Sequence, residues 1–282
     1  RHQLHARGQR AVVVVGGHDE FVFEELKVAT QAVLRGASIA VRPGELVALL
    51  GANGAGKSTL LSVLAGDLAA QAGSVTLDGR PLEALDAAAQ ARRRAVLTQD
   101  ATLAFDLGVE EVVAMGLYPY PDLPAGEAYR LVGQALDLAD AAALRDRRYP
   151  ELSGGERQRV QLARALAQCL GAGREPGRPR YLLLDEPAAG LDPGHQNGLL
   201  QVLRDVRGDG ATGVLVILHD VNLAVRWCDR LALLADGRVV ADGPPAEVLT
   251  ESLLERVYRA RAAVVPHPLL PGRPLVLFGH QR

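Results

Sequence analysis

Cysteine is scarce in this chain: the 282 residues include only two, Cys169 and Cys228. Each lies in an apolar stretch with helical spacing, so we expect two buried thiols rather than a disulfide or a reactive site. The cysteine quartet of a zinc module is therefore absent from the sequence, and the seven histidines show no spacing typical of metal ligands.

Long apolar runs and a strong net charge are also missing. No run approaches the ~20 residues that span a bilayer, and residues 11–15 and 214–218 are only of strand length. The basic, polar start of the sequence shows no secretory signal. A formal net charge of −2 argues against general nucleic-acid affinity. With 48% hydrophobic residues, the composition predicts a globular cytosolic protein of one large domain or two lobes.

Strand-like and helical patterns alternate along most of the chain, which favours a largely parallel sheet with helices on its faces. We expect strands at 46–50, 74–77, 95–97, 181–184, 213–218 and 231–235, and helical segments at 58–65, 108–170, 195–206 and 223–228. Residues 1–25 fit an extension, a strand at 11–15 with a loop, or a poorly ordered segment. Residues 171–180 form a loop by composition, and four prolines after residue 262 argue against a final helix.

The segment 51–59 reads G-A-N-G-A-G-K-S-T and fits a phosphate-binding loop between a strand and a helix. Glycines let the backbone point its N–H groups at phosphate oxygens, and the helix N-terminus adds a partial positive charge. Lys57 can reach the β- and γ-phosphates, and the Ser58 hydroxyl can ligate Mg²⁺. The alternative is a chance glycine-rich turn. The predicted ATP-binding residues here are Gly51, Asn53, Gly54, Ala55, Gly56, Lys57, Ser58 and Thr59.

Two carboxylates follow the apolar run 181–184. Ligands of α/β sheets sit beyond the carboxyl ends of strands, so both acids should face the bound phosphates. Asp185 is placed to hold Mg²⁺, and Glu186 to orient or deprotonate the attacking water. Many strands end in acids, and the specificity of this pair comes from the phosphate-binding loop that precedes it.

The segment 152–156, L-S-G-G-E, precedes a helix. Ser153 and Glu156 have the spacing of a capping box. A capping box does not explain Gly154 and Gly155, which cost about 1 kcal/mol each in a helix interior and somewhat less near a terminus. Close approach of the backbone to an anion explains them better. Ser153, Gly154 and Gly155 are therefore candidate ATP contacts.

The segment 152–156 and the helix after it resemble the signature motif of ATP-binding-cassette (ABC) ATPases. Gln99 matches the Q-loop of that family, which senses Mg²⁺, residues 190–192 match its D-loop, and His219 matches the switch histidine that contacts the γ-phosphate. The resemblance covers roughly residues 26–250. It implies a P-loop NTPase fold of the α/β class, with a RecA-like core, an antiparallel β subdomain and a helical signature subdomain at about 100–168. Residues 1–25 then form an extension, and 251–282 a C-terminal helix with a proline-rich tail.

Two departures from the family pattern stand out. Family members usually carry an aromatic residue about two dozen positions before the phosphate-binding loop, to stack on adenine, but residues 26–34 contain none. Phe21 and Phe23 lie just upstream and are not assigned this role. The loop 171–180 is longer than usual and should bulge at the surface. The arginine clusters 92–94 and 145–148 are interpreted as solvated helix faces or interdomain pairs, and Trp227 as a core residue.

The resemblance also implies partners. Two copies should pair head to tail as a homodimer, with the signature segment of one closing over ATP on the other. A chain without a membrane span needs two separate permease subunits, a periplasmic substrate-binding protein engaged indirectly, and a peripheral place on the cytoplasmic face of the inner membrane. No nucleic-acid partner is expected.

The segments after Gln99, around the signature and in the tail resemble the ATPase of bacterial haem importers, which belong with vitamin B12 and iron-siderophore importers. Haem is therefore the expected cargo, with a siderophore or cobalamin as the alternative. A soluble ABC ATPase of translation or DNA repair is a further alternative. It is disfavoured because the chain has one cassette, no coiled coil and no cysteine quartet.

Overall fold

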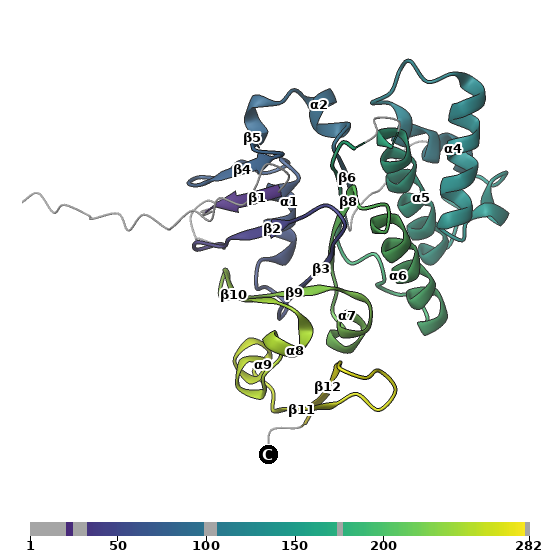
Figure 1. Ribbon diagram of the computed structural model, residues 1–282. Coiled ribbons are helices and arrows are strands. Elements are labelled where there is room, and N and C mark those ends of the chain that lie inside the picture. The colour runs from purple at the N-terminus through teal and green to yellow at the C-terminus, as the bar shows by residue number, and fades with distance from the viewer. Residues whose placement is uncertain (1–20, 25–32, 99–105, 174–176, 280–282) are drawn as a thin grey trace, which may run out of the picture.

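The computed structural model describes residues 21–24, 33–98, 106–173 and 177–279 of the chain. Its strands form a six-stranded sheet, a smaller four-stranded sheet and a C-terminal hairpin, and helices pack on both faces of the larger sheet (Figure 1). The predicted α/β architecture is confirmed. No helix within the described residues has the length and apolar character needed to cross a membrane.

Five strands of the large sheet run parallel, and an antiparallel strand borders one edge. In spatial order the strands are β10 (Arg238–Gly243), β9 (Arg230–Ala235), β3 (Leu46–Leu50), β8 (Thr212–Ile217), β7 (Arg180–Leu184) and β6 (Arg94–Leu97). The five parallel strands lie within one residue of the predicted ranges at either end. The sequence did not indicate β10, because its outward residues are polar and only partly buried.

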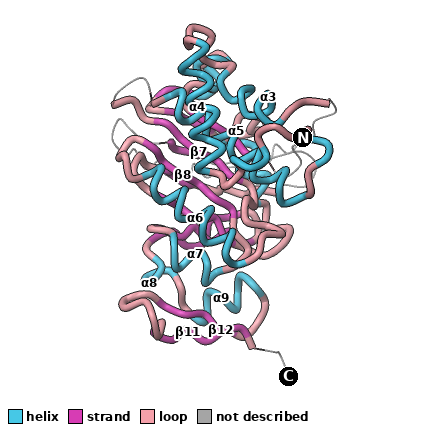
Figure 2. The backbone as a smooth tube through the Cα atoms, turned by 90° about the vertical axis from the view of Figure 1, so that its right-hand side faces the viewer, coloured by secondary structure: helices cyan, strands magenta, loops and turns pink. Residues whose placement is uncertain are grey.

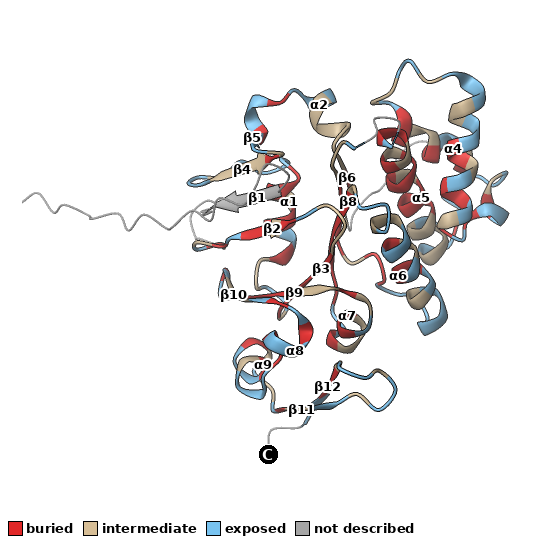
Figure 3. Cartoon of the chain, in the orientation of Figure 1, coloured by how far each residue is buried: buried red, intermediate tan, exposed pale blue. Residues whose placement is uncertain are grey.

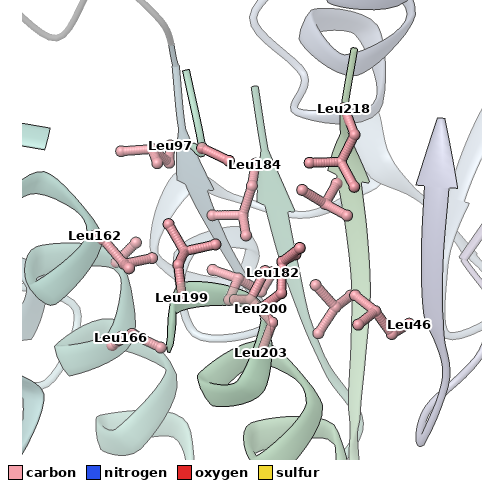
Figure 4. Packing of buried hydrophobic residues seen from close by; sticks show 14 of the residues in the cluster. Leu46, Leu97, Leu162, Leu166, Leu182, Leu184, Leu199, Leu200, Leu203 and Leu218 are labelled. Carbon is pink, nitrogen blue, oxygen red and sulfur yellow. The ribbon is translucent and has the colours of Figure 1, made fainter. Parts of the chain in front are cut away.

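Strand β3 shows why the central strands are apolar throughout. Successive side chains of a strand point to opposite faces, so a strand covered on both faces needs apolar residues at every position. Leu46 and Leu50 belong to one hydrophobic core, whereas Val47 and Leu49 belong to the core on the other face. Figure 4 shows Leu46 in the first core, which leucines of neighbouring strands and of two helices complete. Each face of the sheet therefore has its own hydrophobic core.

One face packs on helix α1 and the small sheet, and the other packs on longer helices (Figures 1 and 3). The α-helices are α1 (Lys57–Leu64), α2 (Ala87–Ala91), α3 (Val109–Ala114), α4 (Ala125–Leu138), α5 (Gly154–Ala172), α6 (Pro193–Arg207), α7 (Val221–Trp227), α8 (Pro245–Val248) and α9 (Glu251–Tyr258). Short 3-10 helices cover Leu82–Ala84, Met115–Leu117, Ala142–Leu144 and Tyr149–Glu151. Since α1 and α5 lie on opposite faces, the phosphate-binding and signature segments belong to different layers.

The small sheet is antiparallel and has the order β2-β1-β4-β5. Its strands are β1 (Phe21–Glu24), β2 (Ile39–Val41), β4 (Ser74–Leu77) and β5 (Arg80–Pro81). Strand β1 lies within residues 1–25, which we expected to form an N-terminal extension. Because β1 pairs with β2 and β4, these four residues belong to the small sheet. Residues 1–20, with the candidate strand at 11–15, lie outside the described residues.

Helices α3, α4 and α5 pack together as a helical lobe, seen at the top of Figure 2. Val109, Val112 and Val113 are buried at helical spacing on α3, and four residues of α4 bury the face that meets α5. Helix α5 continues to Ala172, two residues into the expected loop. Gly171 is packed there, since a Cβ on it would lie 2.5 Å from the Tyr120 ring. Close packing therefore outweighs the low helix propensity of glycine.

The C-terminal residues form helix α9 and then a hairpin of β11 (Ala262–Pro266) and β12 (Pro274–Phe278). Two of the four tail prolines, Pro266 and Pro274, form the last pair of the ladder, next to the turn. The absence of a helix after residue 262 was predicted, but the hairpin was not. Proline is compatible with strand ends, where no ladder hydrogen bond is lost.

Arginines of both clusters form ion pairs within the chain. Arg93 pairs with Asp78 at 3.2 Å, and Arg145 pairs with Glu110 at 2.8 Å within the helical lobe. Both cysteines are free and buried, and burial raises the pKa of Cys169 to about 12. Trp227 packs against the core and donates from Nε1 to Asn197 at 3.0 Å.

Gly116 allows the turn after α3 to touch the backbone of α5. A Cβ at this position would lie 2.2 Å from the Arg164 carbonyl oxygen and 3.2 Å from the Gln168 amide. We predict that Gly116→Ala destabilises the protein by about 3 kcal/mol, because backbone atoms cannot move aside cheaply. Gly133→Ala is the matched control within α4. Its Cβ would meet only Arg145 Nη1 at 3.6 Å, so we expect it to stabilise by about 0.5–1 kcal/mol. Denaturant midpoints measure both, and equal midpoints for Gly116→Ala and the parent would contradict the close contact.

Candidate active site

The phosphate-binding loop connects the buried strand β3 to helix α1, as predicted. Gly51, Gly54 and Gly56 adopt φ values of 154°, 78° and 102°, which side-chain-bearing residues rarely adopt. Gly51 also has no room for a side chain, since a Cβ would lie 2.3 Å from the Leu234 carbonyl oxygen. Helix α1 has no side-chain cap and no acidic residue in its first turn. Its N-terminal amides are therefore available to an anion.

Lys57 lies within this loop and is 6% exposed. Its Nζ donates to the carbonyl oxygens of Gly51 at 2.9 Å and Ala52 at 3.1 Å. Burial lowers the pKa of Lys57, and the negative charges of Glu186 and Asp185 raise it in opposition. A cation thus lies among loop amides, an arrangement suited to a polyphosphate.

Asp185 follows strand β7 and is 7% exposed. It accepts a hydrogen bond from the Ser58 hydroxyl, whereas its buried Oδ1 has no hydrogen-bond partner within the described residues. Burial raises the pKa of Asp185, with a smaller opposing effect from the Ser58 hydroxyl. A buried carboxylate oxygen without a donor, next to a hydroxyl, is a donor set suited to a hard divalent cation.

Glu186 and His219 meet at the ends of β7 and β8. His219 Nε2 lies 2.6 Å from Glu186 Oε1, and the side chain of Glu186 is 12% exposed. Glu186 adopts a φ of 51°, which is unusual for a residue with a side chain. Its carbonyl oxygen accepts a hydrogen bond from Gln158 Nε2 at 3.0 Å. A carboxylate paired with an imidazole at this edge can hold or accept a proton.

Gln158 is a site residue that the sequence analysis missed. It lies on α5, three positions after Gly155, and its side chain donates to the Glu186 carbonyl oxygen. Its only signal in the sequence is its place after the signature segment, because a single glutamine in a helix indicates no chemistry by itself.

The signature segment begins helix α5. Ser153 is the N-cap: its Oγ accepts from the Glu156 amide at 3.4 Å, and its own amide donates to Glu156 Oε2 at 2.8 Å. The capping box therefore exists. A Cβ on Gly154 would meet nothing within 4 Å, and one on Gly155 would meet only Leu191 at 3.7 Å. Packing among the described residues thus gives no reason for either glycine.

Two predicted features cannot be placed. Gln99 lies outside the described residues, as do residues 26–32, where the family's adenine-stacking aromatic is missing. Asp192 of the predicted D-loop is the N-cap of α6 and accepts from the His195 amide at 3.1 Å. Among the described residues, no group of three or more histidine, cysteine or acidic side chains forms a cluster suited to a metal ion.

Comparisons with known proteins agree with this geometry. Residues 34–189 match the family model of the ABC transporter. The hemin import ATP-binding protein HmuV of Bordetella parapertussis is 56% identical over 245 residues, which is 87% of this chain and 93% of that protein. HmuV of Hahella chejuensis is 45% identical over 250 residues, covering 88% of this chain and 94% of its own.

Solved structures show the same fold. The ATP-binding cassette MJ0796, in a dimeric post-hydrolysis state bound to ADP and Pi, aligns with a TM-score of 0.69 and 26% identity, over 80% of this chain and 98% of that chain. An ATP-binding subunit of an ABC transporter aligns with a TM-score of 0.70 and 27% identity, over 81% and 91% of the two chains.

The position of Lys57 generates a binding prediction. We expect Lys57→Ala to weaken ATP binding at least about tenfold, because a charge-assisted hydrogen bond to phosphate is lost. Arg80→Ala removes a cation from the exposed strand β5 and should leave the affinity unchanged. Equilibrium titration with ATP and Mg²⁺ measures both variants. Equal affinities of Lys57→Ala and the parent would show that the loop is not the ATP site.

Proposed function

The chain belongs to the ABC transporter family, and from this membership we propose that it is the ATP-hydrolysing subunit that powers haem import through a separate permease. The observation that carries the proposal is the meeting of Lys57, Asp185, Glu186 and His219 at the carboxyl ends of three neighbouring strands. This edge of a parallel sheet is where α/β proteins bind their ligands.

The loop 51–59 is the proposed ATP-binding segment. In this proposal the amides of Gly54, Gly56 and the first turn of α1 surround the phosphates, and Lys57 moves its Nζ from the loop carbonyls to the phosphate oxygens. Exchanging two carbonyl partners for an anion is favourable, since a charge-assisted bond is about twice as strong as a neutral one. Asn53, Ala55 and Thr59 complete the loop.

Mg²⁺ fits the donor set formed by Ser58 and Asp185, and the lone Oδ1 of Asp185 supports this assignment. Gln99 is added to the set by its place in the family motif. The ion would neutralise charge on the β- and γ-phosphates. Ser58 and Asp185 are already hydrogen-bonded to each other, so both donors are held in place before any ion arrives.

We assign the attacking water to Glu186. Its carboxylate orients the water and accepts its proton, while His219 contacts the γ-phosphate and Gln99 links the site to the permease. The 2.6 Å contact between Glu186 and His219 supports the assignment, because it places the two side chains next to each other at the strand ends. The backbone bond from Gln158 fixes Glu186 further.

The signature glycines are assigned to ATP bound on a second copy. Among the described residues, only Leu191 would come within 4 Å of a Cβ on Gly154 or Gly155, and this open space supports the role because it leaves room for a phosphate. Two copies then pair head to tail, with Ser153 of one facing Lys57 of the other. The dimeric state of the solved relative MJ0796 is consistent with such a pair.

The cargo assignment to haem is supported by relatives named for hemin import that match along nearly their whole length. The partners are two permease subunits and, indirectly, a periplasmic binding protein, with this subunit on the cytoplasmic face of the inner membrane. A siderophore or vitamin B12 is the alternative cargo, and a soluble non-transport ATPase is the less favoured class.

Removing the proposed base tests the hydrolysis step. We expect Glu186→Gln to bind ATP normally and to hydrolyse it at least about 100-fold more slowly, because the amide keeps the shape and loses the proton acceptor. Glu83→Gln, at an exposed position, is the control and should match the parent. An ATPase rate for Glu186→Gln within about threefold of the parent would remove Glu186 from this role.

The two-site arrangement predicts a different defect for Ser153→Arg. A bulky cation should leave ATP binding to one chain nearly intact and prevent ATP-dependent dimers. Ser153→Thr keeps the helix cap and a small side chain, so it should still dimerise. Size-exclusion chromatography with ATP in the Glu186→Gln background provides the measurement. A normal dimer in the Ser153→Arg double variant would contradict the head-to-tail model.

Reconstitution in liposomes with the permease tests the cargo. With the binding protein and haem supplied on the opposite side, haem uptake should require ATP and disappear with Glu186→Gln. Uptake should persist when His195 and His267 are both alanine, since each has a local partner: His195 bonds Asp192, and His267 Nδ1 accepts two amides of the hairpin turn. Uptake of cobalamin or a siderophore in place of haem would overturn the cargo assignment and leave the ATPase assignment intact.

A further inference from the structure

The segment that begins at Glu186 is held by two glutamine side chains from different helices. Gln158 on α5 donates from Nε2 to the Glu186 carbonyl oxygen at 3.0 Å. Gln196 on α6 donates from Nε2 to the Ala188 carbonyl oxygen at 3.2 Å. The two side-chain amides therefore bond the same short stretch of main chain, directly after strand β7.

The packing of α5 and α6 brings both glutamines to this segment. The two helices share one hydrophobic core with β7, and Figure 4 shows Leu162 of α5, Leu199 of α6 and Leu184 of β7 within it. Gln158 and Gln196 each lie near the N-terminal end of their helix. The apolar face of each helix thus fixes where its glutamine can reach.

Glu186 is a residue whose backbone needs such support. Its φ of 51° lies in the left-handed region, which a residue with a side chain keeps only where tertiary contacts hold it. Before it, the Asp185 amide donates to the Leu97 carbonyl oxygen at 2.8 Å, which fixes the chain to β6. After it, the Glu186 carbonyl oxygen accepts from the Ala189 amide at 3.1 Å as well as from Gln158. Both peptide groups of Glu186 are therefore held in place.

The direction of the Glu186 side chain follows from this backbone, because the Cα–Cβ bond turns with the two peptide groups beside it. The carboxylate lies 2.6 Å from His219 Nε2, and the side chain is 12% exposed. A change in the main chain of Glu186 would therefore move its carboxylate relative to His219.

The chemistry of the two glutamines limits what they can do. A glutamine amide has no group that titrates near neutral pH, so neither side chain can act as an acid or a base. Both amide groups donate to main-chain carbonyl oxygens. An effect of either glutamine on hydrolysis must therefore pass through the position of Glu186.

We propose that Gln158 and Gln196 are a pair of positioning residues for hydrolysis, which hold the main chain of residues 186–188 so that the Glu186 carboxylate points at the attacking water. This inference rests on the proposed function, in which Glu186 activates that water. It assigns the two glutamines to the rate of hydrolysis and gives them no part in ATP affinity.

The test removes each donor and keeps the length of the side chain. Gln158→Met and Gln196→Met should each lower kcat about threefold to tenfold, the range that one hydrogen bond accounts for, and leave the Kd for ATP within about twofold of the parent. Gln201→Met is the control on α6: its exposed side chain bonds only Asp205 in the described residues, at 2.8 Å, so kcat should not change. Denaturant midpoints show that each variant is folded, and leucine replaces methionine in any variant that is not.

Two further measurements use the Glu186→Gln background. There either methionine should change the residual ATPase rate less than about twofold, because the side chain that the glutamines position no longer accepts a proton. Gln158→Met should also keep the ATP-dependent dimer on size-exclusion chromatography, which separates this role from damage to the signature segment.

The outcomes separate the two proposals. A parent protein without ATPase activity, or a Glu186→Gln variant with the parental rate, would overturn the proposed role of Glu186 and this inference together. If both of those tests succeed, a parental kcat in either methionine variant would overturn only the inference. So would a raised Kd for ATP, a lost dimer, or an equal fall of kcat in the Glu186→Gln background or in Gln201→Met. A lower kcat in both variants, at parental Kd and only where Glu186 is present, would support it.

Discussion

Burial of the parallel strands on both faces is the constraint on which the active site depends. Every position of β3 is buried, with alternate residues in two separate cores. A strand held in this way cannot slide by one residue, because a slip would exchange the two sets of side chains. The positions where β3, β7 and β8 end are therefore fixed relative to one another, and so are the polar residues that follow them.

The charged groups at these strand ends depend on one another. Removing an amine or a carboxylate from water is costly unless an opposite charge is near. Burial disfavours the charged forms of Lys57 and Asp185, whereas each attracts the other, so both pKa values reflect a balance of opposing effects. His219 Nε2 lies 2.6 Å from Glu186 Oε1 in the same group of side chains. The site therefore contains positive and negative side chains. A bound polyphosphate would add negative charge, and its cation would add positive charge.

The sequence located Lys57, Asp185, Glu186 and His219, which the structure brings together, because each lies shortly after an apolar run whose end is easy to locate. It predicted the parallel strands for the same reason. It did not predict β10, whose outward residues are polar, or the hairpin, whose prolines argued only against a helix. Contacts between distant segments could not be predicted from the sequence. Gln158 bonds Glu186, and Asn222 bonds Val276, through side chains that form no recognisable local pattern. A sequence motif indicates the chemistry of a site. The residues that hold the motif in place are determined by tertiary packing, which leaves no local pattern in the sequence.

The same distinction applies to the contact between the helical lobe and the core. At the site, a side-chain amide on α5 is hydrogen-bonded to the backbone after β7. A backbone hydrogen bond of this kind depends on the relative position of the two elements and on no charge. Helix α5 therefore holds Glu186 through its main chain, while the contact with His219 holds its carboxylate. The positive φ of Glu186 places this residue where the two influences meet. Its backbone conformation is held by the tertiary contacts around it rather than by local preference.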